Sequence, residues 1–394
     1  MRSKPVVYFG STASAEPKPE HSIVGKLDKI VEELGLLEKV KGKHVLVKVH
    51  VGQNVGFTNI HPFITGRIVR KIKQAGGKPF VVDIPEQVEN AIYRGYTPEV
   101  IGCPILPVAG PKDSYFVSKE VNYKGLKALE MGGFCKDADV LVVLSHVKGH
   151  NTSGFGASIK NLALGCYTRR TRFGMHRTMQ YDKYWFPERA RNPEEIAKRL
   201  VEACPRKAIK YEKGKLTLVF DLCNQCMRCK RVDPDDCLVI RRVNFESFFE
   251  AMAMAAQFVL EHYDEDSRFF INVALDITEV CDCWGITTGN ILPDLGVLGS
   301  KDILAIDKAT LDLLRDKPLI VENVSRSFDV IDDPRLHPFA RIHGPWKDPY
   351  LQIYYGEKYG LGSVEYEIIE VNPPGPWLSE KLPPPSFPEP LNLY

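Results

Sequence analysis

The sequence of 394 residues lacks a long hydrophobic run, a strong net charge and, over one long stretch, any carboxylate. No run approaches the ~20 apolar residues that a membrane helix needs, and no signal-peptide cleavage pattern follows the N-terminus. The formal net charge of +2 gives no general attraction for nucleic acid or an acidic membrane. We therefore expect a cytoplasmic protein without a membrane partner, whose ten cysteines are ligands and buried thiols and not a disulfide framework.

The chain is longer than one ordinary hydrophobic core requires, which predicts two or three domains. Apolar runs alternate with amphipathic stretches, a pattern typical of an α/β fold with a parallel or mixed sheet flanked by helices. The run from His44 to Val51 indicates a buried strand, and His61-Pro62 indicates the start of the next helix.

Four cysteines within one segment form the strongest motif of the chain. Cys204 precedes a proline, and Cys223, Cys226 and Cys229 form a C-x2-C-x2-C run. This arrangement resembles bacterial ferredoxins, in which such a run gives three thiolates to one cubane and a Cys-Pro of the other half gives the fourth. The positions that would hold a second cluster are Glu194, Ala197, Leu200 and Asp233, none of which is a thiol. We therefore predict a single [4Fe-4S] cluster on the four cysteines.

A structural zinc ion is the alternative for this motif, because four thiolates also suit a tetrahedral ion. Zinc sites more often use pairs of C-x2-C than a triplet, which favours the iron–sulfur cluster. The segment 192–242 is thus expected to be a small ferredoxin-like α+β insert. It separates a first α/β part (1–191) from a second (243–371), and a proline-rich extended tail (372–394) follows.

No carboxylate occurs between Asp139 and Asp182, although this stretch is rich in histidine, lysine and arginine. It follows a predicted strand, and α/β folds bind ligands in loops beyond the carboxyl ends of such strands. Its glycines let backbone N–H groups approach an anion, and the start of the following helix is expected to leave its N–H groups free. We predict an anionic-substrate site here, with a solvated basic loop as the alternative. The candidate residues are His150, Lys160 and His176 for catalysis, and Lys148, Asn161, Arg169 and His61 for substrate binding.

Two further cysteines, Cys281 and Cys283, come just after a predicted strand. Two thiols two residues apart on an extended segment point the same way, so they could bind a metal ion, extend a redox relay or be inert. Cys237 is interpreted as a spare thiol outside the cluster.

Short motifs spread over most of the chain point to one family. They are Leu46-Val-Lys-Val-His50, His61-Pro62, Ser145-His-Val-Lys148-Gly-His150, Lys160-Asn161-Leu162, Cys281-Asp-Cys283, Asp294-Leu-Gly296, Ser300-Lys-Asp302, Asp307 and Gly360-Leu-Gly362. Together they resemble the domain-of-unknown-function 362 proteins, many of which carry an internal ferredoxin module. The resemblance implies an iron–sulfur protein and names no shared reaction.

A second, weaker similarity is to the nickel-pincer lactate racemases, which carry a His-x3-Gly-Phe-x4-Lys signature followed by another histidine. His150, Gly154-Phe155, Lys160 and His176 fit that spacing. The resemblance implies a proton-transfer base at His150, a cofactor-anchoring lysine at Lys160 and a nickel ligand at His176. Where the racemases have Gly-Gly-Arg before the lysine, this chain has Ala157-Ser158-Ile159.

Three functions follow from these patterns. The leading one is an iron–sulfur oxidoreductase that acts on a small anionic organic substrate. The second is a lactate-racemase-like isomerase with a structural cluster. The third is a non-catalytic electron carrier whose basic insert docks a redox partner such as a ferredoxin. A nucleic-acid role of the insert rests on charge alone and is not favoured.

Overall fold

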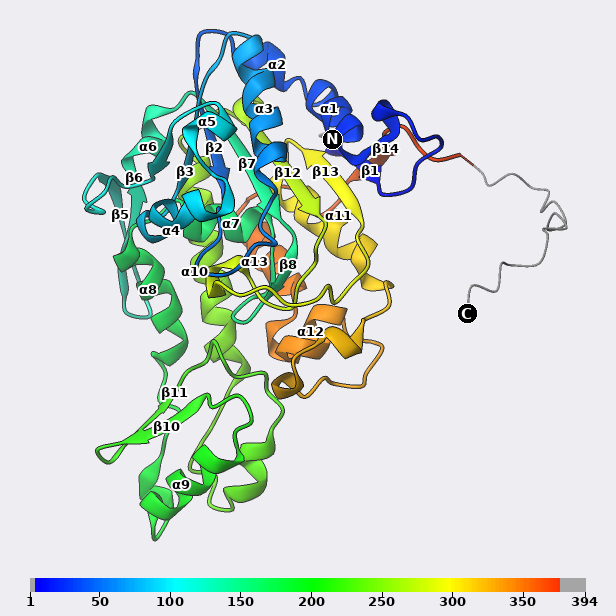
Figure 1. Cartoon of the computed structure of the whole chain (residues 1–394). Helices are drawn as coiled ribbons and strands as arrows, with labels where there is room; N and C mark the ends of the chain where they lie inside the picture. The colour runs from blue at the N-terminus through cyan, green and yellow to red at the C-terminus, as the bar shows by residue number, and fades with distance from the viewer. Residues whose placement is uncertain (1–3, 376–394) are drawn as a thin grey trace, which may run out of the picture.

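An eight-stranded mixed sheet organises the computed structural model, which describes residues 4–375 (Figure 1). The strand order is β14-β1-β13-β12-β7-β2-β3-β4, in which β13 runs antiparallel to both of its neighbours and the other pairs are parallel. The strands are β1 (Val6–Ser11), β2 (His44–Val49), β3 (Lys78–Asp83), β4 (Ile105–Pro107), β7 (Val140–His146), β12 (Arg268–Ala274), β13 (Gly296–Ser300) and β14 (Glu367–Glu370). The predicted α/β class with a mixed sheet is confirmed.

Helices cover both faces of this sheet. They are α1 (Ile23–Glu33), α2 (Leu36–Lys39), α3 (Pro62–Gln74), α4 (Pro85–Asn90), α5 (Pro98–Ile101), α6 (Gly133–Asp137), α7 (Ser158–Gly165), α8 (Arg169–Arg177), α9 (Pro193–Ala203), α10 (Arg242–Leu260), α11 (Ile303–Arg315), α12 (Pro338–His343) and α13 (Tyr350–Lys358). None of the helices described over residues 4–375 is long and apolar enough to cross a membrane.

Alternation along β2 shows how the sequence directs side chains to the two faces. Val45, Val47 and Val49 belong to the core under α1 and α3, whereas Leu46 belongs to the core on the other face. The period of two along a strand therefore places Lys48 on the face of Leu46, where α7 contacts β2. The strand ends at Val49, two residues earlier than predicted, because the N–H of Val51 donates to the Asp83 carboxylate.

Three two-stranded sheets supplement the main one. They are formed by β5 (Phe116–Tyr123) with β6 (Leu126–Gly132), β8 (Lys148–His150) with β9 (Gly154–Gly156), and β10 (Ile209–Glu212) with β11 (Lys215–Leu218). Figure 1 shows α9, β10 and β11 at the end of the molecule opposite α1 and α2. The domain boundaries of this insert stay a prediction, and residues 376–394 of the predicted tail lie outside the described residues.

Candidate functional site

The carboxyl ends of the adjacent strands β7, β2 and β3 meet at a cavity of about 390 Å³. Helices α7 and α8 and part of the insert complete its wall. The polar residues that line it are Lys48, His50, Asp83, Gln87, Lys148, His150, Thr152, Lys160, Asn161, Arg172, His176, Asp221 and Cys283.

Asp83, at the end of β3, holds two residues from the end of β2. Its Oδ1 lies 3.0 Å from Lys48 Nζ and its Oδ2 lies 3.1 Å from His50 Nδ1, with all three side chains buried. Burial opposes the charge of Asp83, but Lys48 and His50 outweigh it and hold the pKa of this carboxyl well below its usual range. Because Nδ1 of His50 faces a carboxylate, it carries a proton. The other ring nitrogen, Nε2, is buried and has no hydrogen-bond partner.

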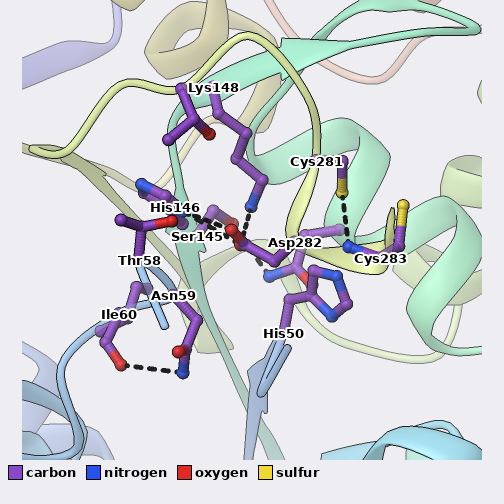
Figure 2. Close-up of polar contacts among 12 residues, drawn as sticks. His50, Thr58, Asn59, Ile60, Ser145, His146, Lys148, Cys281, Asp282 and Cys283 are labelled. Carbon is purple, nitrogen blue, oxygen red and sulfur yellow. Dashed lines mark hydrogen bonds and ion pairs between the residues drawn. The ribbon is translucent and has the colours of Figure 1, made fainter. Parts of the chain in front are cut away.

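Cys281 and Cys283 lie in the loop between β12 and β13, next to His50 (Figure 2). Lys160 Nζ from α7 is 2.9 Å from Cys281 Sγ and 4.0 Å from Cys283 Sγ. Burial opposes ionisation of Cys281, but its hydrogen bond with Cys283 and the Lys160 ammonium hold its pKa well below the ordinary value. The pKa of Cys283 is raised, because its thiol is hydrogen-bonded to Cys281 and buried. The two thiols thus behave as one thiolate and one thiol beside an ammonium.

Asp282, between these cysteines, anchors their turn to the end of β7. Its Oδ2 is 3.0 Å from His146 Nδ1 and 2.8 Å from Lys148 Nζ, and Figure 2 shows both side chains pointing toward it. Burial disfavours the charge of Asp282, but the two basic groups outweigh burial and lower its pKa. Lys148, predicted as a substrate ligand, is therefore already paired with a carboxylate.

His150 is held in one tautomer by its own loop. The N–H groups of Thr152 and Ser153 both donate to His150 Nδ1 at 3.2 Å, so that Nε2 carries the proton and faces Cys283 Sγ at 3.9 Å. Burial and the nearby Lys160 lower the pKa of His150 well below its usual range, so the ring is neutral. For Lys160 itself, burial opposes the charge, but the cysteines outweigh it and raise its pKa.

His176 in α8 closes the cavity toward the insert. Its Nδ1 is 2.7 Å from Asp221 Oδ1, the same oxygen that accepts a hydrogen bond from Thr152 Oγ1 at 2.7 Å. Burial alone would raise the pKa of Asp221, but His176 and Thr152 lower it. An imidazole whose Nδ1–H is held by a carboxylate presents Nε2 for proton transfer.

The other predicted substrate residues are placed differently. Asn161 lines the cavity, but its amide donates to Leu144 O at 3.1 Å and Ser145 Oγ at 3.0 Å, so it also links α7 to β7. Arg169 is exposed and lies outside the cavity. His61 is exposed and accepts from the N–H of Phe63 at the start of α3.

The expectation of free N–H groups at the start of α7 is wrong. Those of Ser158 and Ile159 donate to the two oxygens of Asp307 at 3.0 and 2.8 Å. Burial raises the pKa of Asp307 to about 6 and outweighs the hydrogen bonds from Asn272, Ile159 and Ser158, which lower it. The first two N–H groups of α7 are therefore satisfied by a carboxylate of α11 and are not free for an anionic ligand.

Asp83 and Asp221 are site residues that the sequence analysis missed, and Lys48 and His50 entered it only as part of a motif. Lys48, His50 and Asp83 carry a usable signal, since they stand at the ends of two apolar runs, now β2 and β3, whose carboxyl ends meet if the strands are parallel. Asp221 carries no such signal, because it comes from the insert.

The four cysteines of the ferredoxin-like motif line a second, smaller hollow within the insert. Cys204 follows α9, and its Sγ accepts from the N–H of Ala208 at 3.3 Å. Burial and the neighbouring thiols raise the pKa of Cys229 to about 12. Cys237 is buried but does not line this hollow.

The two hollows share a stretch of chain. Val219, Asp221 and Leu222 line the larger cavity, and Cys223, the next residue, lines the hollow of the four cysteines. The buried Lys347 holds this stretch in place by donating to Phe220 O at 3.0 Å and Asp221 O at 3.2 Å, and also to Asn151 O. Burial lowers the pKa of Lys347 to about 8.

Comparison with known proteins gives a family and no reaction. No curated protein matches the chain. Among solved structures, a lactate racemase apoprotein from Thermoanaerobacterium thermosaccharolyticum matches with 12% identity and a TM-score of 0.33, covering 69% of this chain and 51% of that one. A structural-genomics protein from Thermotoga maritima matches with 12% identity and a TM-score of 0.31, covering 66% and 51%. The chain thus spans about half the length of these two structures. The family model of the domain of unknown function DUF362 matches residues 45–312, more than half of the chain, and the protein belongs to this family.

Proposed function

We propose that the protein is an iron–sulfur oxidoreductase, with one [4Fe-4S] cluster held by the four cysteines of the insert and a small anionic organic substrate in the larger cavity. The observation that carries this proposal is the shared wall: Leu222 lines the cavity and Cys223 lines the cysteine hollow. Consecutive Cα atoms are about 3.8 Å apart. A cluster bound to Cys223 would therefore lie directly behind the substrate pocket.

The spread of the four sulfur atoms supports a cluster over a single zinc ion. Bonds of about 2.3 Å to one tetrahedral zinc ion would place the sulfur atoms roughly 3.8 Å from one another. Within residues 4–375, no three of these four sulfur atoms all lie within 4.8 Å of one another. The described residues that do meet this spacing are His50, Cys281 and Cys283. Four thiolates placed more widely around one hollow fit the corners of a cubane.

Arg172 and Lys160 are the groups that we assign to binding the anion. Arg172 in α8 lines the cavity; one terminal nitrogen pairs with Glu86 Oε2 at 3.2 Å, while its Nε is buried without a hydrogen-bond partner. A buried donor of this kind is costly unless a ligand satisfies it, and a guanidinium is well suited to a carboxylate. Lys160 lines the same cavity, and its ammonium contacts the sulfur atoms of Cys281 and Cys283.

A bound cubane supplies or accepts one electron at a time, in exchange with a redox partner such as a ferredoxin. The protein's own residues then manage charge and protons. Arg172 and Lys160 balance the negative charge of the substrate, and His176 exchanges a proton through Nε2 while Asp221 holds Nδ1. Leu164 and Phe173 form an apolar part of the cavity wall beside the neutral His150.

An isomerase like the lactate racemases is a second candidate, because His150 and His176 line the same cavity and either could move a proton. Isomerisation needs no net electron, so the two proposals differ in the redox state of the cluster during turnover. A pure electron carrier is less well supported, since it has no use for a cavity lined by a guanidinium with an unsatisfied N–H group.

The test is anaerobic purification followed by iron, sulfide and zinc analysis. About four irons and four sulfides per chain are expected. Cys204→Ala should lose the cluster or reduce it to a three-iron form, whereas the matched control Cys237→Ala should keep the visible spectrum. Small oxo- and hydroxy-carboxylates are then screened for oxidation or reduction of the cluster by electron paramagnetic resonance. Stoichiometric zinc without sulfide would refute the redox proposal, and racemisation with an unchanged cluster would favour the isomerase.

A further inference from the structure

A second group of ligand atoms lies beside the cavity, separate from the four cysteines of the insert. One ring nitrogen of His50, Sγ of Cys281 and Sγ of Cys283 all lie within 4.8 Å of one another, and Nε2 is the His50 nitrogen that Asp83 leaves unengaged. We propose that these three residues bind one divalent transition-metal ion of the zinc class, with its remaining coordination position open to the cavity for an oxygen of the substrate. This site does not depend on the cluster and goes beyond the proposed electron transfer.

The donor set fits such an ion. Two thiolates and one imidazole form a soft, mixed set that suits zinc and related ions, and catalytic zinc sites of this type keep three protein ligands. The Nε2 atom of His50 is buried and without a partner, so the fold leaves a good ligand atom unsatisfied. Metal binding would satisfy it and replace the protons of the thiols.

Two carboxylates hold the proposed ligands in place, one at His50 and one in the turn that carries the two cysteines. Asp83 contacts His50 Nδ1 at 3.1 Å, which orients the ring so that Nε2 points away from β3. Carboxylates that hold a metal-binding histidine in this way are a common feature of metal sites. Asp282, paired with His146 and Lys148, fixes the turn that carries both cysteines. The three ligands are therefore positioned before any ion binds.

Lys160 occupies the place of a cation at this site. Its ammonium is 2.9 Å from Cys281 Sγ and balances the negative charge that an ion would otherwise balance. An ion bound to the thiolates would compete with this contact and release the ammonium toward the cavity, which Lys160 already lines. The bound ion would thus make Lys160 available to the anionic substrate.

The open position follows from which residues reach the cavity. His50 and Cys283 line it, while Cys281 lies behind them. His150 is near Cys283 Sγ, but the backbone N–H groups on its Nδ1 leave the proton on Nε2, so it donates to sulfur and does not complete the coordination. An ion with three protein ligands and a free position can polarise a carbonyl or carboxylate oxygen as a Lewis acid.

The test uses anaerobically purified protein whose iron content is measured first, so that the cysteines of the insert are accounted for. After treatment with a chelator that spares the cluster, the protein is titrated with Co²⁺, whose absorption bands report thiolate ligands. About one ion per chain should bind. His50→Ala and Cys281→Ser should abolish these bands with the iron content unchanged, and Asp83→Asn should weaken binding by about 10- to 100-fold. Cys103→Ser, at a buried thiol that lines a different hollow, is the matched control.

Three outcomes would overturn the proposal: no cobalt–thiolate bands, bands that persist in both His50→Ala and Cys281→Ser, or equal loss in the control. Azide, added as a small anion, should shift the visible bands if a position is open to the cavity, and unchanged bands would refute the open position.

Lys160→Met should bind Co²⁺ at least as tightly as the wild type, because the competing ammonium is gone. Weaker binding in this variant would contradict the competition. Failure of the cluster would show separately, as missing iron with cobalt binding intact.

Discussion

Replacing Asp83 by asparagine should destabilise the fold strongly, because it isolates a buried ammonium. The side chains of Lys48 and Asp83 are each 1% exposed, and their charged atoms are 3.0 Å apart. The asparagine side chain would keep the size of the original and an oxygen for the N–H of Val51, so the change removes charge with little change in packing. Removing one partner of a buried pair costs about 3–5 kcal/mol, since the other charge is left without compensation.

The matched control is Asp28→Asn in α1, which breaks ion pairs with Arg67, whose side chain is 41% exposed, and with Lys71 at 3.6 Å. Pairs of this kind contribute about 0–1 kcal/mol. Urea unfolding followed by circular dichroism, in one buffer at pH 7, compares the free energies of unfolding of both variants with the wild type. A loss in Asp83→Asn that is no larger than in Asp28→Asn would refute the reasoning, because the Lys48 side chain would then be compensated by another group or by water in the folded protein.

The pH dependence of this difference has a definite sign. The folded-state pKa of Asp83 is lowered, so its stabilising contribution is present above the unfolded pKa of about 3.9 and is lost as the pH falls. The difference in unfolding free energy between wild type and Asp83→Asn should therefore be largest near neutral pH and shrink in acid. A difference that grows below pH ~4 would contradict the assignment of the charged form to Asp83.

Three further predictions address other parts of the molecule. The pKa of Asp307 is raised to about 6 by burial, so the wild type should lose up to about 3 kcal/mol of stability between pH ~4 and ~7, and urea unfolding of Asp307→Asn should lack this slope. Lys160→Ala should lower turnover of an identified substrate by about 100-fold with the cluster spectrum intact, whereas the exposed control Lys183→Ala should not. Tyr167→Phe should cost about 1 kcal/mol in the same unfolding assay, because it removes the buried hydrogen bond of 2.6 Å to Ala255 O, and no loss would mean that water replaces it.

The fold class could be predicted because its signals are local. The apolar run from His44 and the proline after His61 indicate β2 and α3, each of which depends on neighbouring residues only. The order of strands could not be predicted in the same way. β12 pairs with β7, more than 100 residues earlier in the chain, and β13 turns antiparallel between β12 and β1. Such pairings depend on long-range packing, which a single sequence does not encode in any one segment.

The candidate site, like the fold, could be predicted only where its signals are local in the sequence. His150, Lys160 and His176 were predicted from one continuous segment, and all three line the cavity. The groups that orient two of them come from elsewhere in the chain, since Asp221 holds His176 and Cys281 contacts Lys160. The helix start predicted to bind an anion failed for the same reason, because its partner Asp307 follows about 150 residues later.

Because no carboxylate occurs between Asp139 and Asp182, the basic residues of this stretch find their partners elsewhere in the chain, and these partners are of two chemical kinds. Lys148 and His176 pair with the carboxylates of Asp282 and Asp221, which lie far away in the sequence. Lys160 instead receives two thiols. A thiolate can be taken up by a metal ion or oxidised, whereas a carboxylate partner cannot be removed by redox chemistry. The charge of Lys160 is therefore the one in this segment whose compensation depends on the state of Cys281 and Cys283. Any event at these cysteines would change how strongly the cavity attracts an anion.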